Sequence, residues 1–569
     1  MNYKPPVEEQ KFLLAHVVRL DELTGGNGFH DASPDVVHAI VEGAGAFAAA
    51  EFAPLNRAGD RIGARWSAEG VTLPPGFREA YRAYVEAGWA TLAGPPEHGG
   101  QGLPLSLATV VMEDLGSANM GFSLVMMLTP GAVEALQHHG SEALKQAWLP
   151  KLVSGEWTGT MNLTEPQAGS DVGALKTRAE PAGDGTYRIR GQKIFITFGE
   201  HDLTDNIVHL VLARLPDAPL GTKGITLFLV PKILPDGTRN DLRCVSIEHK
   251  LGIHASPTCV MSYGDEGGAV GWLIGEENKG MAAMFTMMNN ARLNVGLQGV
   301  SIAERAMQQA VAFALERVQG AREGRPAQIV EFPDVRRMLL RMKALTQAAR
   351  ALTYYTAGQT DRATLGDAAA RARADLLTPL VKAYGTDVGV EVTSLALQVH
   401  GGMGYVEETG AAQHYRDARI SPIYEGTNGI QAADLVGRKL DLKSGETLAE
   451  LLGEIRRDDA DGRLNELVEA IEEIVAWLRG GASVDDRLAS SYPLMTMLSV
   501  AVAGWLMKRQ AKEAKQMLDQ DEGDPAFLRM KLAAAEYYDG MIEEALGLAD
   551  QAKRGARLLY AISREDFAD

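Results

Sequence analysis

The chain has 569 residues, which is too long for one hydrophobic core, so we expect two to four domains. Hydrophobic residues make up 46% and charged residues 23%, as in ordinary soluble globular proteins. The formal net charge of −18 argues against a polyanionic partner such as nucleic acid, although a small acidic ligand would need only a local basic patch.

Signals for secretion, metal binding and membrane insertion are weak throughout the sequence. The N-terminal residues lack a basic stretch followed by an apolar one, so we expect no secretory signal and a cytoplasmic protein. Cys244 and Cys259 have no CxxC or Cys/His spacing around them, which predicts buried free thiols rather than a metal site. The longest apolar run, Leu494–Met507, is shorter than the roughly 20 residues of a membrane span and predicts a buried helix.

Residues 1–158 are predicted to form a mostly helical N-terminal domain. Ser33-Pro34 is a typical start signal for the helical pattern that begins at Asp35. A glycine-proline loop at 94–102 interrupts the helices. Helical periodicity is also present at Phe77–Ala87, with a stop at Gly88. It resumes after the loop and continues through Met126, and it is present again at Gly131–Leu152.

Residues 159–282 are predicted to form a compact antiparallel β-domain. Short β-branched or alternating runs are separated there by turns such as Asp184-Gly185 and Pro235-Asp236-Gly237. The predicted strands are Tyr187–Ile196, Asn206–Ala213, Gly224–Val230, Cys244–Glu248, Thr258–Tyr263 and Val270–Ile274.

Helices are predicted to return in a bundle at residues 283–440, including Val300–Gln319 and Val335–Ala357. Residues 441–569 read as an appended helical domain with 16 Lys and Arg against 26 Asp and Glu, a net charge of −10. In that domain Leu464 to Leu478 show helical spacing, and Gly480-Gly481 ends the pattern. Pro493 is predicted to start the next helix at its first position.

Three segments place short polar residues in hydrophobic surroundings: Met161–Gly173, Gln398–Tyr405 and Ser421–Gln431. The first could bring backbone N–H groups close to a planar ligand, or be an ordinary loop. The second lacks GxGxxG spacing and favours a helix-ending glycine cluster in which His400 is structural. In the third, Glu425 could be a buried carboxyl suited to proton abstraction, or a glutamate that stabilises a helix N-terminus.

Taken in order, five segments resemble the acyl-CoA dehydrogenase family over about residues 35–440. They are Thr164–Asp171, Lys193–Thr197, Asn290–Arg292, Gln398–Tyr405 and Tyr424–Gln431. The resemblance implies an α+β multidomain fold with an N-terminal helical domain, a central antiparallel β-domain and a C-terminal helical bundle. The start of the chain and the appended helical domain are similar to a long subgroup of this family.

The resemblance implies FAD as the cofactor, with contacts from several parts of the chain. Leu163, Thr164, Gly169 and Ser170 match the loop that lines the isoalloxazine ring. Phe195 stands where the family usually has Trp, and Ile196 and Thr197 follow it, with Thr197 near flavin N5. Contacts to the pyrophosphate across a subunit boundary are matched by Arg317, Gln398, Gly401 and Gly402. Contacts just past the base are matched by Thr427 and Gly429. Arg317-Val318-Gln319-Gly320 is one residue shorter than the family's Arg-x-x-Phe-Gly, so the resemblance leaves an aromatic flavin contact there open.

For the substrate, the resemblance implies an acyl-CoA thioester and α,β-dehydrogenation to the trans-2-enoyl-CoA. Glu425 matches the base that takes the α-proton while the β-hydrogen leaves as hydride to the flavin. Some relatives carry their base near Arg292, but no carboxylate occurs in that segment here. The other positions that match the substrate side are Ser170, Asn289, Tyr424 and Gly426.

The expected partners are an electron-transfer flavoprotein as electron acceptor and a second copy of the chain in a homodimer, with no nucleic acid and no stable membrane insertion. An acyl-CoA oxidase, which passes electrons to oxygen, shares the fold and the base. A non-catalytic DNA-associated flavoprotein needs a basic surface, against which the −10 of residues 441–569 argues. A flavin monooxygenase of this fold would not require Glu425.

Overall fold

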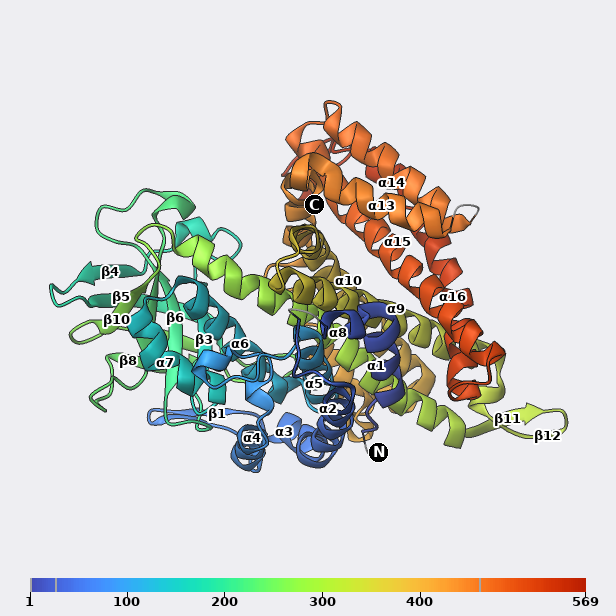
Figure 1. Ribbon diagram of the computed structural model, residues 1–569, viewed down its shortest axis with the longest axis horizontal. Helices are drawn as coiled ribbons and strands as arrows, with labels where there is room; N and C mark the ends of the chain where they lie inside the picture. Colours follow the sequence, from blue (N-terminus) through green and yellow to red (C-terminus); the bar gives the residue numbers. More distant parts are fainter. Residues whose placement is uncertain (1–2, 26–27, 460–461, 569) are drawn as a thin grey trace. The chain divides into compact units, whose positions relative to one another are not determined.

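The computed structural model describes residues 3–25, 28–459 and 462–568 (Figure 1). They form two compact units. The sheet unit contains residues 31–294 together with the short segment 3–5. The helical unit contains residues 6–30 and 295–568.

The sheet unit begins with helices whose starts follow from the sequence. Ser33 caps α2 by accepting a hydrogen bond from the Val36 N–H, and Pro34 lies in the first turn, as predicted. Three buried rings, Phe52, Phe77 and Phe122, pack with centroids 4.6 and 4.3 Å apart and join these helices into one core. The helices are α2 (Pro34–Phe47), α3 (Asn56–Ile62), α4 (Phe77–Glu86), α5 (Leu105–Ala118), α6 (Met120–His139) and α7 (Glu142–Ser154).

The eight-stranded sheet that follows has the order β3-β6-β7-β10-β5-β9-β8, with β4 paired to β5. Its strand pairs are antiparallel, as predicted, except β3–β6, which is parallel. Cys244 and Cys259 lie buried in its core as free thiols, as predicted. The strands are β3 (Thr158–Asn162), β4 (Arg178–Pro181), β5 (Tyr187–Thr197), β6 (Ile207–Ala213), β7 (Thr226–Pro231), β8 (Leu242–Ile247), β9 (Thr258–Tyr263) and β10 (Ala269–Ile274). A small hairpin of β1 (Arg65–Ser67) and β2 (Gly70–Thr72) precedes it.

The helical unit is built on long helices that approach each other closely. A Cβ atom added to Gly299 of α8 would lie 1.9 Å from the Gly385 carbonyl oxygen of α10, so only glycine permits this packing. The helices are α8 (Gly280–Glu316, which starts in the sheet unit), α9 (Pro333–Thr364), α10 (Ala368–His400), α11 (Ala411–Ala418) and α12 (Asn428–Gly437).

The predicted helix Val300–Gln319 is wrong at its end, because α8 stops at Glu316. Val318 and Gln319 instead belong to β11 (Val318–Arg322), which pairs with β12 (Arg325–Gln328) in an exposed hairpin. Gly320 and Gly324 adopt φ angles of +71° and +77°, which a right-handed helix does not allow.

The appended domain contains α13 (Glu446–Asp458), α14 (Arg463–Arg479), α15 (Val484–Asp519), α16 (Pro525–Leu546) and α17 (Ala549–Lys553), drawn in orange and red in Figure 1. Gly480-Gly481 separates α14 from α15, as predicted. The start predicted at Pro493 is wrong, because a capping box between Ser483 and Asp486 begins α15 and leaves Pro493 inside the helix.

Two stretches, Pro34–Ile62 and Val484–Asp519, are long and apolar enough to cross a membrane by length and composition alone. In the second, 89% of the most apolar window is buried, and buried core helices pass the same test. In the first, 33% of that window is buried.

The N-terminal helix α1 (Val7–Leu13) belongs to the helical unit and packs on the appended domain. The buried Lys531 ammonium of α16 lies 2.5 Å from the Glu9 carboxylate and 2.6 Å from the Gln510 side chain of α15. Phe12 packs against Phe527 with ring centroids 5.8 Å apart. A buried ion pair and an apolar cluster therefore hold residues from the two ends of the chain together.

Candidate active site

The loop at residues 163–173 follows β3 and is tied to β5 through its backbone. The Ile194 N–H donates to the Thr164 carbonyl at 2.9 Å, and the Lys193 ammonium donates to the Leu163 carbonyl at 2.9 Å. Gly169 and Ser170 are exposed. The loop is thus fixed at its start and presents small residues to solvent at its tip.

Glu165 organises this loop from the inside. Its carboxylate is buried and accepts hydrogen bonds from the Lys193 ammonium at 2.9 Å, from the Thr177 hydroxyl at 2.6 Å and from the Lys176 N–H at 2.6 Å. Burial alone would raise the pKa of Glu165, but the adjacent Lys193 and these hydrogen bonds outweigh it and lower the pKa to about 2. Burial lowers the pKa of Lys193 to about 8, against the opposing effect of Glu165. Sequence reasoning did not assign either residue a role.

A bulge at the end of β5 turns Phe195 outward. The register between β5 and β9 shifts between Lys193 and Ile196, and Phe195 has a φ angle of +60° with 57% of its side chain exposed. Ile196 is buried in the sheet core, so only its backbone can face a ligand, while Thr197 is half-buried. An exposed aromatic ring therefore stands next to a hydroxyl, on a strand whose other side is fixed in the core.

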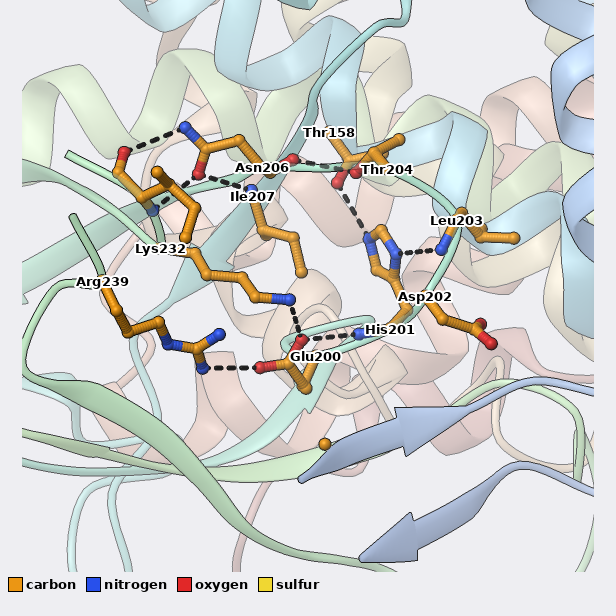
Figure 2. Close-up of polar contacts among 12 residues, drawn as sticks. Thr158, Glu200, His201, Asp202, Leu203, Thr204, Asn206, Ile207, Lys232 and Arg239 are labelled. Atoms are coloured by element: carbon orange, nitrogen blue, oxygen red, sulfur yellow. Dashed lines mark hydrogen bonds and ion pairs between the residues drawn. The ribbon is translucent and has the colours of Figure 1, made fainter. Parts of the chain in front are cut away.

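The loop after β5 is anchored by a polar network (Figure 2). The buried Glu200 carboxylate pairs with Lys232 at 2.5 Å and with Arg239 at 3.1 Å. His201 contacts the Thr158 hydroxyl at 2.9 Å and accepts a hydrogen bond from the Leu203 N–H. Burial lowers the pKa of His201 to about 3, so the ring is neutral. These contacts join the end of β5 to β3 and β7.

Further along the sheet unit, the first part of α8 carries Asn289 and Arg292. Arg292 is buried and Asn289 is half-buried. Between them, the Asn290 amide donates to the Glu134 carboxylate of α6 at 3.2 Å, and the Asn294 amide donates back to Asn290. These polar contacts therefore fix the orientation of the first part of α8 about its axis.

In the helical unit, Glu425 lies in a tight turn immediately before α12. Glu425 and Gly426 have φ angles of +57° and +78°, and the Glu425 side chain is half-buried. The Thr427 hydroxyl caps α12 by accepting from the Ile430 N–H at 3.2 Å, and the Gln431 amide donates to the Glu425 carbonyl at 3.3 Å. A positive φ at a glutamate is sterically unfavourable and persists only where the surroundings enforce it.

Tyr424 anchors the other side of the same turn. Its side chain packs inward, and its hydroxyl donates a hydrogen bond to the Gln298 side chain of α8. Burial, together with the charge of the neighbouring Glu425, raises the pKa of Tyr424. The order Tyr-Glu-Gly therefore gives an inward anchor, a carboxylate and a glycine that permits the turn.

Arg317, Gln398, Gly401 and Gly402 are exposed at the ends of α8 and α10. The two helix ends are held together because the His400 ring stacks on Phe313 with centroids 4.6 Å apart. His400 also bonds the Ala396 carbonyl at 2.7 Å, so it is structural, as expected. The structure thus brings these four predicted residues to the neighbouring ends of α8 and α10. Gly429 of α12 is also exposed, but it follows Asn428, whose side chain bonds Asp387 in the middle of α10, so it lies away from that end.

Within the described parts of the chain, no group of three or more His, Cys, Asp or Glu side chains could hold a metal ion. The chemistry available here comes from the carboxylate of Glu425, from hydroxyl and backbone groups of the sheet unit, and from the exposed Arg317 guanidinium.

Four family models match the chain in sequence order. They describe the acyl-CoA dehydrogenase N-terminal domain (residues 35–156), middle domain (160–265) and C-terminal domain (278–440), and an acetyl-CoA dehydrogenase C-terminal-like domain (448–563).

Known proteins are similar over nearly the whole chain. The 3-methylmercaptopropionyl-CoA dehydrogenase of Ruegeria pomeroyi is 46% identical over 95% of both chains. A broad-specificity linear acyl-CoA dehydrogenase of Mycobacterium tuberculosis is 34% identical over 94% of this chain and 95% of its own. The structure of an acyl-CoA dehydrogenase complexed with FAD from Bacillus anthracis has the same fold, with a TM-score of 0.75 and 22% identity over 94% of this chain and 90% of that one.

Proposed function

The chain belongs to the acyl-CoA dehydrogenase family, whose cofactor is FAD, and we propose that Glu425 is the base with which it oxidises an acyl-CoA thioester to the trans-2-enoyl-CoA. The observation that carries the proposal is the enforced turn around Glu425. The backbone of Glu425 is held at a positive φ between the inward anchor Tyr424 and Gly426, so the point from which its carboxylate projects is fixed.

The residues present fit FAD. The bulge at Phe195 offers an exposed aromatic face beside the Thr197 hydroxyl, as a planar ring system with polar edges requires. Arg317 is exposed and matches the chemistry of a pyrophosphate, which a guanidinium binds in a bidentate way. When bound, FAD supplies the two-electron acceptor that no side chain can provide.

The protein's own contribution is to position groups and to accept a proton. Glu425 would take the α-proton on a carboxylate oxygen, because half-burial next to Tyr424 limits its solvation and favours proton abstraction. The Glu425 backbone N–H is a candidate donor to the thioester oxygen as negative charge develops there. The loop fixed by Glu165 and the bulge at Phe195 would hold the cofactor's ring in one place.

Beyond the dehydrogenation itself, we propose an electron-transfer flavoprotein as the electron acceptor, a homodimer, a role in fatty acid β-oxidation and a cytoplasmic location. The resemblance of the five motif segments to the family supports the acceptor and the cross-subunit roles of Arg317 and Gln398. The similarity to 3-methylmercaptopropionyl-CoA dehydrogenase supports a short acyl-CoA as the first substrate to assay.

The proposal is tested with Glu425→Gln, which keeps the size of the side chain but cannot accept the proton. Because a general base contributes about 10²- to 10⁴-fold in rate, we expect flavin reduction by acyl-CoA to slow at least about a hundredfold in a stopped-flow experiment. Glu536→Gln, at an exposed position of α16, makes the same chemical change as a control. Reduction of Glu425→Gln within a few-fold of wild type would assign the base elsewhere. Reoxidation of the reduced enzyme within its turnover time in air would favour an oxidase.

A further inference from the structure

We infer that the appended helical domain positions the Glu425 turn, through Tyr492 of α15 and Asp387 of α10. The inference rests on the proposed role of Glu425. It joins a part of the chain that contains none of the five motif segments to the turn that carries the base. The connection consists of two consecutive hydrogen bonds inside the helical unit.

Asn428, the first residue of α12, fixes the end of the Glu425 turn. Its side chain is buried, and its amide nitrogen donates to the Asp387 carboxylate at 2.8 Å and to the Thr386 hydroxyl at 3.0 Å. Its amide oxygen accepts from the Lys382 ammonium at 2.8 Å. With both ends of the amide engaged, the side chain of Asn428 has one favourable orientation.

The position of Asn428 governs the turn because the backbone closes on itself there. The Asn428 N–H donates to the Pro422 carbonyl at 3.0 Å, so the intervening residues form a closed loop with Glu425 near its centre. Tyr424 fixes one side of this loop on α8, and Asn428 fixes the other side on α10. Since the positive φ of Glu425 is unfavourable, loosening either anchor would let the carboxylate move.

Asp387 connects this anchor to the appended domain. One of its oxygens accepts from Asn428, and the other accepts from the Tyr492 hydroxyl at 2.7 Å. Asp387 is half-buried and Tyr492 is 38% exposed, so this hydroxyl–carboxylate bond lies at the edge of the helical unit. A hydrogen bond to a charged carboxylate is shorter and stronger than one between neutral groups. Removing the Tyr492 hydroxyl would free Asp387 to turn and would weaken its hold on Asn428.

Two variants test the inference in the full-length flavin-containing enzyme. Tyr492→Phe removes the hydroxyl and keeps the ring, and Asp387→Asn keeps the shape but leaves one acceptor oxygen for two donors. Tyr560→Phe is the matched control, because this tyrosine belongs to the same domain and is 72% exposed. A lost hydrogen bond that acts through a positioning residue is worth about three- to tenfold in rate. We therefore expect both variants to slow flavin reduction about three- to tenfold, and the control to match wild type.

The readout must separate positioning from general loss of structure. FAD content and the dissociation constant of acyl-CoA should stay within about twofold of wild type, so that the loss falls on the first-order reduction step. A second probe is a 3-thiaacyl-CoA, in which sulfur replaces the β-carbon, so that the α-proton can be lost but no β-hydride can leave. Its absorbance change on binding reports proton removal alone and should be smaller in both variants.

The outcomes distinguish this inference from the proposed function. If wild type reduces its flavin, Glu425→Gln does not, and both Tyr492→Phe and Asp387→Asn match wild type in reduction and in the thia-analogue signal, the positioning role is refuted while Glu425 remains the base. If Glu425→Gln reacts like wild type, the proposed function has failed first. Equal losses of FAD, affinity and rate would also refute positioning, because they indicate a general defect.

Discussion

Replacing Lys193 by methionine would leave the Glu165 carboxylate buried without its ion-pair partner. The side chains of Lys193 and Glu165 are 0% and 3% exposed, so solvent cannot replace the lost ammonium. Removing one partner of a buried ion pair costs about 3–5 kcal/mol. Glu165 keeps its hydrogen bonds from Lys176 and Thr177, so we expect the lower end, about 3 kcal/mol.

The loss should appear first in flavin binding, since the Lys193 ammonium also holds the Leu163 carbonyl of the loop that is proposed to line the flavin. We expect Lys193→Met to release FAD at a lower temperature than wild type, followed by flavin fluorescence during heating. Lys279→Met is the control, because the Lys279–Glu276 pair is 65% and 71% exposed. An exposed pair contributes at most about 1 kcal/mol, so the control should behave like wild type.

A double variant makes the reasoning refutable. Glu165→Leu with Lys193→Met removes both charges, and replacing a whole buried pair by apolar residues is often nearly neutral. The double variant should therefore release FAD at a higher temperature than Lys193→Met alone. If Lys193→Met retains FAD like wild type, or if the double variant loses as much as the two single variants together, the pair is not the coupled anchor described here.

Three further predictions concern other parts of the molecule. Arg317→Ala should lose FAD more readily on dilution, because its guanidinium is proposed to reach the pyrophosphate across a subunit boundary; flavin occupancy that does not depend on protein concentration would contradict this. A chain ending near Leu440 should aggregate or change its oligomeric state by light scattering, because the apolar faces covered by α15 would be exposed; a flavin-bound form of unchanged mass would contradict it. Acid should destabilise the helical unit as the pH falls from about 4.5 to about 2, since buried Glu304 beside Arg350 has a pKa of about 2 rather than 4.5. Because the pKa is lower in the folded state, Glu304 stabilises the fold at pH values above its unfolded pKa, and this contribution is lost below its folded pKa. The loss in the free energy of unfolding is about 3 kcal/mol and can be measured from urea midpoints across this pH range.

Local signals in the sequence were enough to predict most elements. The strands follow from alternating runs bounded by turn residues, and β9 has the predicted bounds Thr258–Tyr263. Competing local signals point to the wrong boundary at two places. Pro493 indicates a helix start, but Ser483, ten residues earlier, forms with Asp486 the capping box that begins the helix, and Pro493 lies within it. The helical pattern through Gln319 also predicts too long a helix, because Gly320 and Gly324 at positive φ turn the chain into a hairpin that begins at Val318.

The candidate site divides in a similar way. Glu425 could be found because its neighbours Tyr424 and Gly426 belong to a contiguous motif. The groups that hold such motifs in place could not be found, because they come from positions that are far apart in the sequence. Lys193 is 28 residues from Glu165, and Tyr492 is 105 residues from Asp387. Periodicity and spacing carry no information about which buried lysine meets which glutamate, since that depends on the packing of whole elements.

The placement of residues 6–30 in the helical unit has a consequence for synthesis on the ribosome. This segment emerges before the sheet unit, but its partners, such as Lys531 and Phe527, emerge more than 500 residues later. The sheet unit in between is continuous from residue 31 to 294 and can fold while the rest is being translated. During that time the apolar face of α1, including Phe12 and Leu13, lacks the late residues that cover it in the folded protein. The apolar face of α1 must therefore avoid non-native association until α15 and α16 have been synthesised. Because so long a loop has to close, we expect the docking of α1 to be a late and slow step of folding.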